Sequence, residues 1–448
     1  MSPDYDIAVV GAGLAGACAA ALLARHTGIA AERIVLLAGA LPPALAADAP
    51  PDLRVVALSR ASERILQSAA AWARVPARRL CAYERMRVWQ ESSAPDGAGA
   101  LCFDAADVGE PNLGYIAESA LLQRACLESF REAGGVLRTG QVHSLATDTA
   151  CVHLGLAGRG GAAAADAGEA DGGGAVLSAR LVIGADGAHS LVRSQAHIPA
   201  RTRDYHQLAL IATVRTQRPH EHTAWQRFLR TGPLALLPLF DGSSSIVWSL
   251  DTAHAGPLCD CPAAQFEQQL EAAIGGALGA VTLASERRCF PLHSVAAESY
   301  VAPRCALVGD AAHVIHPLAG QGANLGLLDA AALCEVLGAA IAQGEDPGAL
   351  RALRGYEQQR RTHNLVMDAA MSAFQRGFAA TSLPLAWLAG RGLGLVNRST
   401  TLKRAFARQA LGSLGALGPL PRLARAGAVG GAAAALSAAG RDRASRRR

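Results

Sequence analysis

The chain has 448 residues, of which 51% are hydrophobic and 18% charged, so a disordered protein and a small disulfide-stapled scaffold are both excluded. The net charge of +5 is modest, and the densest basic cluster, 441–448, has no interleaved aromatic residues. We therefore expect no nucleic-acid partner. The cluster is either a solvated tail or a segment attracted to an anionic membrane surface.

The apolar runs and the cysteines indicate where the protein works. The longest uncharged runs, 7–24 and 426–440, are rich in Ala and Gly, so no transmembrane helix is predicted. Asp4 and Asp6 precede the first run and no Lys or Arg does, which is wrong for a secretory signal. The ten cysteines include no C-x-x-C pair and indicate reduced thiols. We expect a cytoplasmic protein, with peripheral contact at the inner face of the membrane.

The first predicted element is a short buried strand over 5–10, followed by a glycine-rich turn and an Ala/Leu-rich helix that ends near Arg25. The turn carries Gly11, Gly13 and Gly16 in the pattern G-x-G-x-x-G. The first glycine permits the tight turn, the second lets the backbone approach a pyrophosphate, and the third lets the helix pack on the strand. Because the helix N-terminus also offers free N–H groups, the pattern predicts a dinucleotide-binding βαβ unit.

One part of that fingerprint is missing from the second predicted strand, 33–37. An acidic residue that binds the adenosine ribose is expected about 20 residues after the glycines. Ala38 stands there instead. Either water or backbone holds the ribose, or Asp48 or Asp52 from the following loop replaces the acid, and the sequence leaves these alternatives open.

Further along, the pattern of a strand that ends in a small-residue turn occurs twice more. An Asp-Gly pair closes the first of these strands, and a Gly-Asp pair closes the second. An apolar helix follows the second turn and is expected to end near Ala342. The segments are 179–193 with Asp186-Gly187, 305–313 with Gly309-Asp310, and 316–329, which reads HPLAGQGANLGLLD.

These three motifs, in this order and at about these separations, resemble the group A flavoprotein monooxygenases. Within that group the sequence looks most like the ubiquinone-biosynthesis hydroxylases, because the stretch 316–329 has the form typical of that family. The resemblance runs from residue 4 to about residue 412. Weaker matches lie at 52–59, 113–118, 224–228, 232–235 and 245–249.

The resemblance implies FAD as the cofactor and a set of residues that bind it. Asp310 would hydrogen-bond the FAD ribose, Arg54 would contact FAD, and Asp186 would serve both flavin binding and nicotinamide access. The turn before the last apolar helix would bring backbone N–H groups to the flavin, where the helix end stabilises the negative charge of the reduced ring. The implied residues are Gly11, Gly13, Gly16, Arg54, Asp186, Gly309, Asp310, Pro317, Gly320, Gln321, Gly322 and Asn324.

The resemblance also implies the reaction. NAD(P)H would reduce FAD transiently, and O2 would then form a flavin hydroperoxide that hydroxylates an aromatic ring. The expected substrate is a lipophilic, polyprenylated phenol or benzoquinol of ubiquinone biosynthesis, with membership of a biosynthetic protein complex. The alternatives are a group A hydroxylase of a small aromatic compound and a non-catalytic FAD-binding subunit. A flavin halogenase is disfavoured because the W-x-W-x-I-P motif is absent. No catalytic residue is predicted.

Two histidine pairs, His313 with His316 and His220 with His222, raise the question of a metal. No cysteine or carboxylate cluster accompanies them at ligand spacing, so no metal site is predicted. In the strand-rich middle stretch, Trp225 and Trp248 either pack in the core or line a substrate pocket.

The order of elements predicts an α/β fold: a Rossmann-like FAD-binding domain with a parallel sheet, interleaved with a β-sheet substrate domain and followed by a C-terminal helical region. The FAD-binding domain would consist of 1–75, 104–197 and 286–345, and the substrate-binding sheet of 76–103 and 198–285. The remaining predictions are a mobile surface loop over 158–174, helices over 346–412, an interfacial lipid-facing segment within 383–404 and a disordered tail over 413–448.

Overall fold

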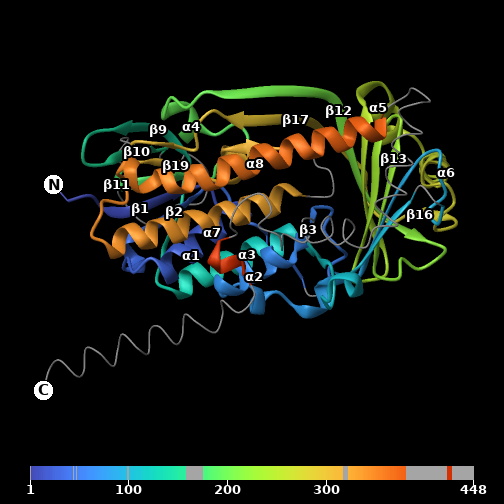
Figure 1. The fold of residues 1–448 in the computed structure, drawn as a ribbon, viewed down its shortest axis with the longest axis horizontal. Coiled ribbons are helices and arrows are strands. Elements are labelled where there is room, and N and C mark those ends of the chain that lie inside the picture. The colour runs from blue at the N-terminus through green and yellow to red at the C-terminus, as the bar shows by residue number, and fades with distance from the viewer. Residues whose placement is uncertain are drawn as a thin grey trace, which may run out of the picture.

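The structure is a computed structural model, and its described residues form three sheets with helices packed around them (Figure 1). Over 368–379 only the helical backbone is described. The predictions for Pro317, Gly320, the 158–174 loop and the 383–404 segment lie outside the described residues, as does most of the tail. The described residues are 2–43, 45–46, 48–97, 100–157, 175–315, 321–379 and 421–425.

The sheet at the N-terminal end of the molecule carries the predicted motifs. Its described strands, in spatial order, are β18 (Val301–Ala302), β19 (Cys305–Leu307), β11 (Val176–Gly184), β1 (Tyr5–Val10), β2 (Ile34–Ala38) and β8 (Val136–Thr139), with β10 (Val152–Leu156) beside β11 and β9 (Val142–Thr147) beside β10. From β19 to β8 the strands are parallel. All of β2 is buried, as expected for a strand that is covered on both faces.

A second, largely antiparallel sheet forms the other end of the molecule (Figure 1). Its described strands are β20 (His313–Val314), β17 (Arg288–Ala297), β12 (Ala200–Thr216), β15 (Ser244–Asp251), β14 (Gly232–Pro238), β13 (Thr223–Leu229), β5 (Arg85–Gln90) and β6 (Leu101–Asp104), with β16 (Val281–Leu283) beside β12. The strand-rich middle stretch expected from the sequence is confirmed: 208–214 lies in β12, 234–238 in β14 and 245–250 in β15. The long strands β12 and β17 run alongside each other between the two ends of the molecule.

Helices cover the parallel sheet and one side of the second sheet. The helix α1 (Leu14–His26) packs against α3 (Ser119–Glu132) and α7 (Gln321–Ala342), and α7 packs against α8 (Leu350–Ala379). The other described helices are α2 (Arg60–Ser68), α4 (Leu191–Gln195), α5 (Thr252–Asp260) and α6 (Ala263–Ile274), with 3-10 turns at Ala31–Arg33, Trp72–Arg74, Ala77–Arg79, Ala105–Val108, Gly309–Ala311 and Arg422–Ala424.

Among the described helices, α7 alone is long and apolar enough to cross a membrane, with a mean hydropathy of 1.8 over its most apolar window. That window is 67% buried inside the protein. The helix also carries Asp329, whose side chain is completely buried and ion-paired. These contacts are those of a core helix.

A third, small sheet contributes one partner of a buried ion pair. It consists of β3 (Val55–Ser59), β7 (Gly114–Glu118) and β4 (Cys81–Tyr83). Arg79 donates to both carboxylate oxygens of Glu118, at 2.7 and 2.6 Å, and the two side chains are 3% and 1% exposed. The guanidinium also donates to Ala49 O and lies 4.7 Å from the ring centroid of Phe240. The pair therefore joins the loop before β3 to the turn between β14 and β15.

The predicted fold class is confirmed, with a parallel sheet, an interleaved antiparallel sheet and a C-terminal helix. The predicted domain boundaries stay predictions. We note that β17 and β20 lie within the 286–345 segment but pair in the second sheet. All ten cysteines lie in the described part of the chain, and all are free thiols.

Removal of one partner of the Arg79–Glu118 pair should be far more harmful than removal of both. Glu118→Leu leaves a buried guanidinium without that carboxylate and is expected to lower the free energy of unfolding by about 3–5 kcal/mol. The double variant Arg79→Met/Glu118→Leu should recover most of this loss, because two apolar side chains of similar volume need no ionic partner. Denaturant unfolding of the single and the double variant measures the two changes in the free energy of unfolding. A double variant as unstable as the single one would contradict this account.

Candidate functional site

The three sequence motifs meet at the carboxyl edge of the parallel sheet, where backbone hydrogen bonds continue past the strand ends. Gly11 N donates to Leu37 O at 2.9 Å, Ala185 N to Val10 O at 2.7 Å, and Val308 N to Gly184 O at 2.9 Å. The turns that follow β1, β11 and β19 are therefore fixed relative to one another. Segments far apart in the sequence form one site.

The glycines of the first motif differ in what surrounds them. Gly11 has φ +103°, and a Cβ there would lie 2.3 Å from Ala185 O. A Cβ on Gly16 would lie 2.0 Å from Gly11 O. A Cβ on Gly13 would meet nothing within 4 Å. Gly11 and Gly16 are thus required by the fold, while Gly13 borders open space at the start of α1, where no side chain caps the helix.

Asp186 of the second motif uses its carboxylate within its own turn. It accepts hydrogen bonds from Ser190 Oγ at 2.5 Å and from Val192 N at 3.2 Å. Arg193 extends from the same turn and donates to Ala188 O and Ala311 O, both at 2.8 Å. Burial lowers the pKa of Arg193, and Asp186 opposes that shift. The second motif is therefore tied to the third by an arginine.

Asp310 of the third motif has a carboxylate that accepts no hydrogen bond from the described residues. Its side chain is exposed at the edge of the site, yet protein surrounds it closely enough that burial raises its pKa. Electrostatic interaction with His313, Arg54 and His293 opposes this rise in the pKa of Asp310. An exposed carboxylate without a partner, set among cationic groups, can accept hydroxyl hydrogens from a ribose.

Below this turn lies a buried polar network centred on Asp329 of α7. Asp329 Oδ2 accepts from Gly309 N at 3.1 Å and lies 2.5 Å from His313 Nε2. Its Oδ1 accepts from Arg360 Nε at 2.7 Å and from Asn364 Nδ2 at 3.2 Å. Burial would raise the pKa of Asp329, but His313 and Arg360 hold it well below its usual range. The carboxylate therefore fixes the Gly309-Asp310 turn to α7 and α8.

Arg360 and this network were missed at the sequence level. Asn364 lies on the buried face of α8 and is 2% exposed. A signal for this network was present in the sequence, because Arg360 and Asn364 are polar residues four positions apart on one helix face. In the structure, Arg360 donates to Asn364 Oδ1. An arginine on a buried helix face requires a carboxylate partner, and Asp329 ends the 316–329 motif.

The start of α7 is held by Asn324. Its Oδ1 accepts from Ser59 N at 2.9 Å and from Ser62 Oγ at 2.6 Å, and its Nδ2 donates to Ala57 O at 2.8 Å. These bonds occupy the Asn324 side chain, so it can serve a cofactor by positioning the helix end. Gln321 is half-buried at the first turn, and a Cβ on Gly322 would meet open space.

Arg54 lies close enough to Asp310 to oppose the rise in the pKa of its carboxylate. Its guanidinium is exposed and lies 5.9 Å from the ring centroid of Phe290 on β17. Its backbone N donates to Asp52 Oδ1, and Asp52 N donates to Glu118 Oε1 at 2.8 Å. The buried Arg79–Glu118 pair therefore helps to set the position of Arg54.

Neither candidate for the missing ribose acid is selected by these contacts. Ala38 is fully buried and its carbonyl accepts from Gly140 N. Asp52 is engaged with Arg54 N, and Asp48 makes no hydrogen bond among the described residues. The ribose is therefore held either by water or backbone, or by Asp48 or Asp52, the alternatives predicted from the sequence.

A cavity of about 370 Å³ opens beside the second motif, between α4 and the long strands. The rings of His189 and His293 lie 5.9 Å apart there, and His293 Nε2 is buried without a hydrogen-bond partner in the described structure. The cavity carries more basic than acidic groups. It is lined by Ala188, His189, Arg193, Thr202, Arg203, Asp204, Pro291, Leu292, His293 and Val295.

Other residues singled out in the sequence have local roles. His220 Nε2 lies 3.3 Å from Leu239 O and His222 Nδ1 lies 3.0 Å from Ala82 O, so the backbone engages both rings. Trp248 is 5% exposed, and Trp225 stacks edge-on to Trp89. Both tryptophans belong to the core of the second sheet.

Comparison with known proteins places these motifs in context. Residues 148–369 match the family described as FAD binding domain. The chain is 36% identical to the 3-demethoxyubiquinol 3-hydroxylase of Escherichia coli, over 91% of this chain and 98% of that protein. It is 37% identical to the ubiquinone hydroxylase UbiL of Rhodospirillum rubrum, over 91% and 90%. The human mitochondrial ubiquinone biosynthesis monooxygenase COQ6 is 32% identical, over 89% and 91%.

Solved structures share the fold at lower identity. The p-nitrophenol 4-monooxygenase PnpA of Pseudomonas putida superposes with a TM-score of 0.70 at 17% identity, over 92% of this chain and 99% of that chain. Pseudomonas aeruginosa PqsL, in complex with 2-aminobenzoylacetate, superposes with a TM-score of 0.65 at 21% identity, over 90% and 99%.

The open space beside Gly13 gives a prediction that separates cofactor binding from folding. Gly13→Val adds a side chain whose Cβ meets no described protein atom within 4 Å, so the unfolding midpoint of the apoprotein should stay close to that of the wild type. The same side chain enters the space a pyrophosphate needs, so the dissociation constant for FAD should rise by about tenfold or more. Flavin fluorescence titration measures it.

Two glycine variants complete this test. Gly256→Ala, in α5, also adds a Cβ in open space and should leave both stability and FAD affinity unchanged. Gly11→Ala should destabilise even the apoprotein, because its Cβ would collide with Ala185 O. Equal FAD affinity in Gly13→Val and Gly256→Ala would show that no pyrophosphate approaches this glycine.

Proposed function

The chain belongs to the FAD-dependent hydroxylases of ubiquinone biosynthesis, and from that membership we propose the reaction. The protein is a monooxygenase that uses O2 and NAD(P)H to hydroxylate the ring of a polyprenylated phenol or benzoquinol. The observation that carries this proposal is the 36% identity to a 3-demethoxyubiquinol 3-hydroxylase over 91% of the chain. The described residues at the carboxyl edge of the parallel sheet support this proposal, although Ala38 stands where a ribose-binding acid is expected.

The residues present fit FAD at the carboxyl edge of the sheet. Gly13 and the start of α1 leave space and unpaired N–H groups for the pyrophosphate, and the free Asp310 carboxylate can accept from ribose hydroxyls. Gln321 and Gly322 begin α7, whose N-terminus favours negative charge nearby. Bound FAD supplies the transfer of electrons from NAD(P)H and the activation of O2.

The protein's own part in the reaction is to orient the reactants and to hold charge. The Asp329 network fixes the turn that carries Asp310, and Asn324 fixes the start of α7. We propose that the reductant docks over the cavity beside Asp186, because Arg193, Arg203 and the two histidines there suit the phosphates of NAD(P)H. No described side chain is assigned as a general base.

The direct test of the reaction is isotope labelling. The FAD-loaded protein is mixed with NAD(P)H, ¹⁸O2 and a panel of short-chain polyprenyl phenols and demethoxyubiquinols, and the products are analysed by mass spectrometry. One panel member should gain a single ¹⁸O atom. Asp310→Ala should lose FAD and product together, while Gly256→Ala should retain both. Oxidation of NAD(P)H with no labelled product from any panel member would contradict the proposed reaction.

We also propose that the protein works in the cytoplasm at the inner face of the membrane, where a lipid-tailed substrate is found. The arginines of 441–448 and the exposed side chains of Leu365 and Val366, 52% and 38% exposed on α8, support this proposal. Membership of a biosynthetic protein complex stays a prediction.

Vesicle sedimentation tests the membrane contact. The protein should bind phosphatidylglycerol-containing vesicles several-fold better than pure phosphatidylcholine, since each basic residue near an anionic surface contributes about 1 kcal/mol. Replacement of the five arginines in 441–448 by glutamine should remove that difference. Leu365→Ser/Val366→Ser should weaken binding to both vesicle types, whereas Val176→Ser, at a 69% exposed position on β11, should not. Equal sedimentation of all variants would contradict the proposal.

A further inference from the structure

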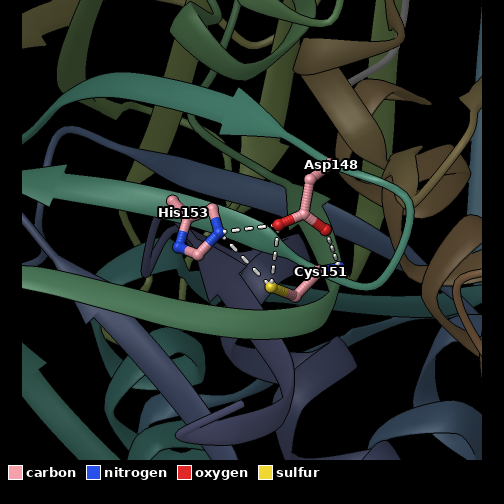
Figure 2. Close-up of side chains that lie close together, drawn as sticks. All are labelled: Asp148, Cys151 and His153. Carbon is pink, nitrogen blue, oxygen red and sulfur yellow. Dashed lines mark hydrogen bonds and ion pairs between the residues drawn. The ribbon is translucent and has the colours of Figure 1, made fainter. Parts of the chain in front are cut away.

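The β9–β10 hairpin carries three potential metal ligands that the cofactor site does not use, two in its turn and one in β10. Asp148, Cys151 and His153 bring one oxygen, one sulfur and one nitrogen atom together (Figure 2). Cys151 Sγ lies 3.4 Å from His153 Nε2 and 3.6 Å from Asp148 Oδ2. Asp148 Oδ2 and His153 Nε2 are 3.0 Å apart. The sequence D-x-x-C-x-H was not recognised as a ligand set at the sequence level.

These three separations are close to those of ligands on one face of a tetrahedral zinc ion. Bonds of about 2.3 Å to sulfur, about 2.0–2.1 Å to nitrogen and about 2.0 Å to oxygen place sulfur about 3.5 Å from the other two atoms. They place nitrogen and oxygen about 3.3 Å apart. The observed distances differ from these by a few tenths of an ångström. A metal can therefore enter with small side-chain adjustments.

The arrangement does not suit a proton relay. A Cys–His–Asp relay uses the two ring nitrogens of histidine on opposite sides, one toward the sulfur and one toward the carboxylate. Here both contacts involve Nε2 of His153. Three ligand atoms that converge on one point are the arrangement of a coordination site.

The backbone preorganises the carboxylate and the thiol. Asp148 Oδ1 accepts from Ala150 N at 2.6 Å and from Cys151 N at 2.7 Å, which leaves Oδ2 for the cluster. Arg304 donates to Thr149 O through Nε and Nη2 and fixes the same turn from outside. The charge of Arg304 is offset by Asp346, 2.7 Å away.

Exposure leaves one coordination position open to solvent. Cys151 is buried, whereas the side chains of Asp148 and His153 are 52% and 43% exposed. Burial, with help from Asp148, raises the pKa of the Cys151 thiol, so a metal would displace a proton from it. A thiolate, an imidazole and a carboxylate together suit Zn²⁺ better than the other common divalent ions. A water molecule would be the fourth ligand.

We propose that Asp148, Cys151 and His153 form a binding site for one Zn²⁺ ion at the turn between β9 and β10. The site is distinct from the cofactor edge. Val152, next to the cluster, pairs with Ala179 on β11, and Asp186 lies seven residues further along, roughly 20 Å away in an extended strand. The ion would therefore stabilise the hairpin and take no part in hydroxylation.

The test uses the full-length, FAD-loaded protein, treated with EDTA and then titrated with Zn²⁺ in competition with a chromogenic chelator. The wild type should bind one Zn²⁺ per chain at this site. Asp148→Asn, Cys151→Ser and His153→Gln should each weaken binding by about tenfold or more, since even loss of a residue behind a ligand costs that much. Asp148→Asn is informative because the amide oxygen can keep the turn while the charge is lost.

Two controls make the outcome decisive. Cys102→Ser removes a partly exposed thiol from β6 and should leave Zn²⁺ binding unchanged. The FAD content of every variant should equal that of the wild type, which shows that each has folded. With Co²⁺ in place of Zn²⁺, the wild type should show d–d bands at longer wavelength than the flavin absorbs, and Cys151→Ser should change them. Wild-type Zn²⁺ binding no tighter than that of a variant with all three ligand substitutions, or equal loss of binding in Cys102→Ser, would overturn the site.

Discussion

The Asp329 carboxylate is where α7, α8 and the turn after β19 meet, and the position of the cofactor site depends on it. A carboxylate this deeply buried is stable only if each oxygen is fully hydrogen-bonded and its charge is offset. His313, Arg360, Asn364 and Gly309 N meet that requirement. Because they come from three elements, the network can form only when those elements are in their native positions. The need to neutralise the buried Asp329 charge therefore fixes the position of the turn that carries Asp310.

Close packing of small residues applies a second constraint at the same turn. A Cβ on Gly309 would lie 3.0 Å from Ala15 Cβ, and one on Gly326 would lie 3.1 Å from it. The first turn of α1, the Gly-Asp turn and α7 are thus in backbone-level contact. A larger side chain at any of these positions would move the pyrophosphate cradle relative to Asp310, so the three motifs are spaced by packing as well as by hydrogen bonds.

The sequence was sufficient for the parallel sheet and its three motifs because glycine patterns and apolar runs are local signals. The strand over 5–10, the helix after it and the strand-rich character of the middle stretch follow from period and turn chemistry alone. The Asp329–Arg360 pair and the ligand cluster at the β9–β10 turn did not follow. Asp329 and Arg360 meet only through tertiary contact between two helices. The ligand cluster forms only in a hairpin turn that was not predicted from the sequence. Neither arrangement produces a periodic pattern of hydrophobic residues in the sequence.

The interleaving of the two sheets has a consequence for how the protein is made. Val10 pairs with Leu37 on one side and with the distant Gly184 on the other, and Gly184 pairs in turn with Leu307. The β11–β19 pairing, and with it the third motif, therefore cannot form until residues beyond 307 have left the ribosome. Such non-local pairing folds slowly and leaves unpaired strand edges exposed meanwhile. Nascent chains should depend on chaperones during synthesis, and FAD can be captured only late in translation, once the Asp310 turn is available.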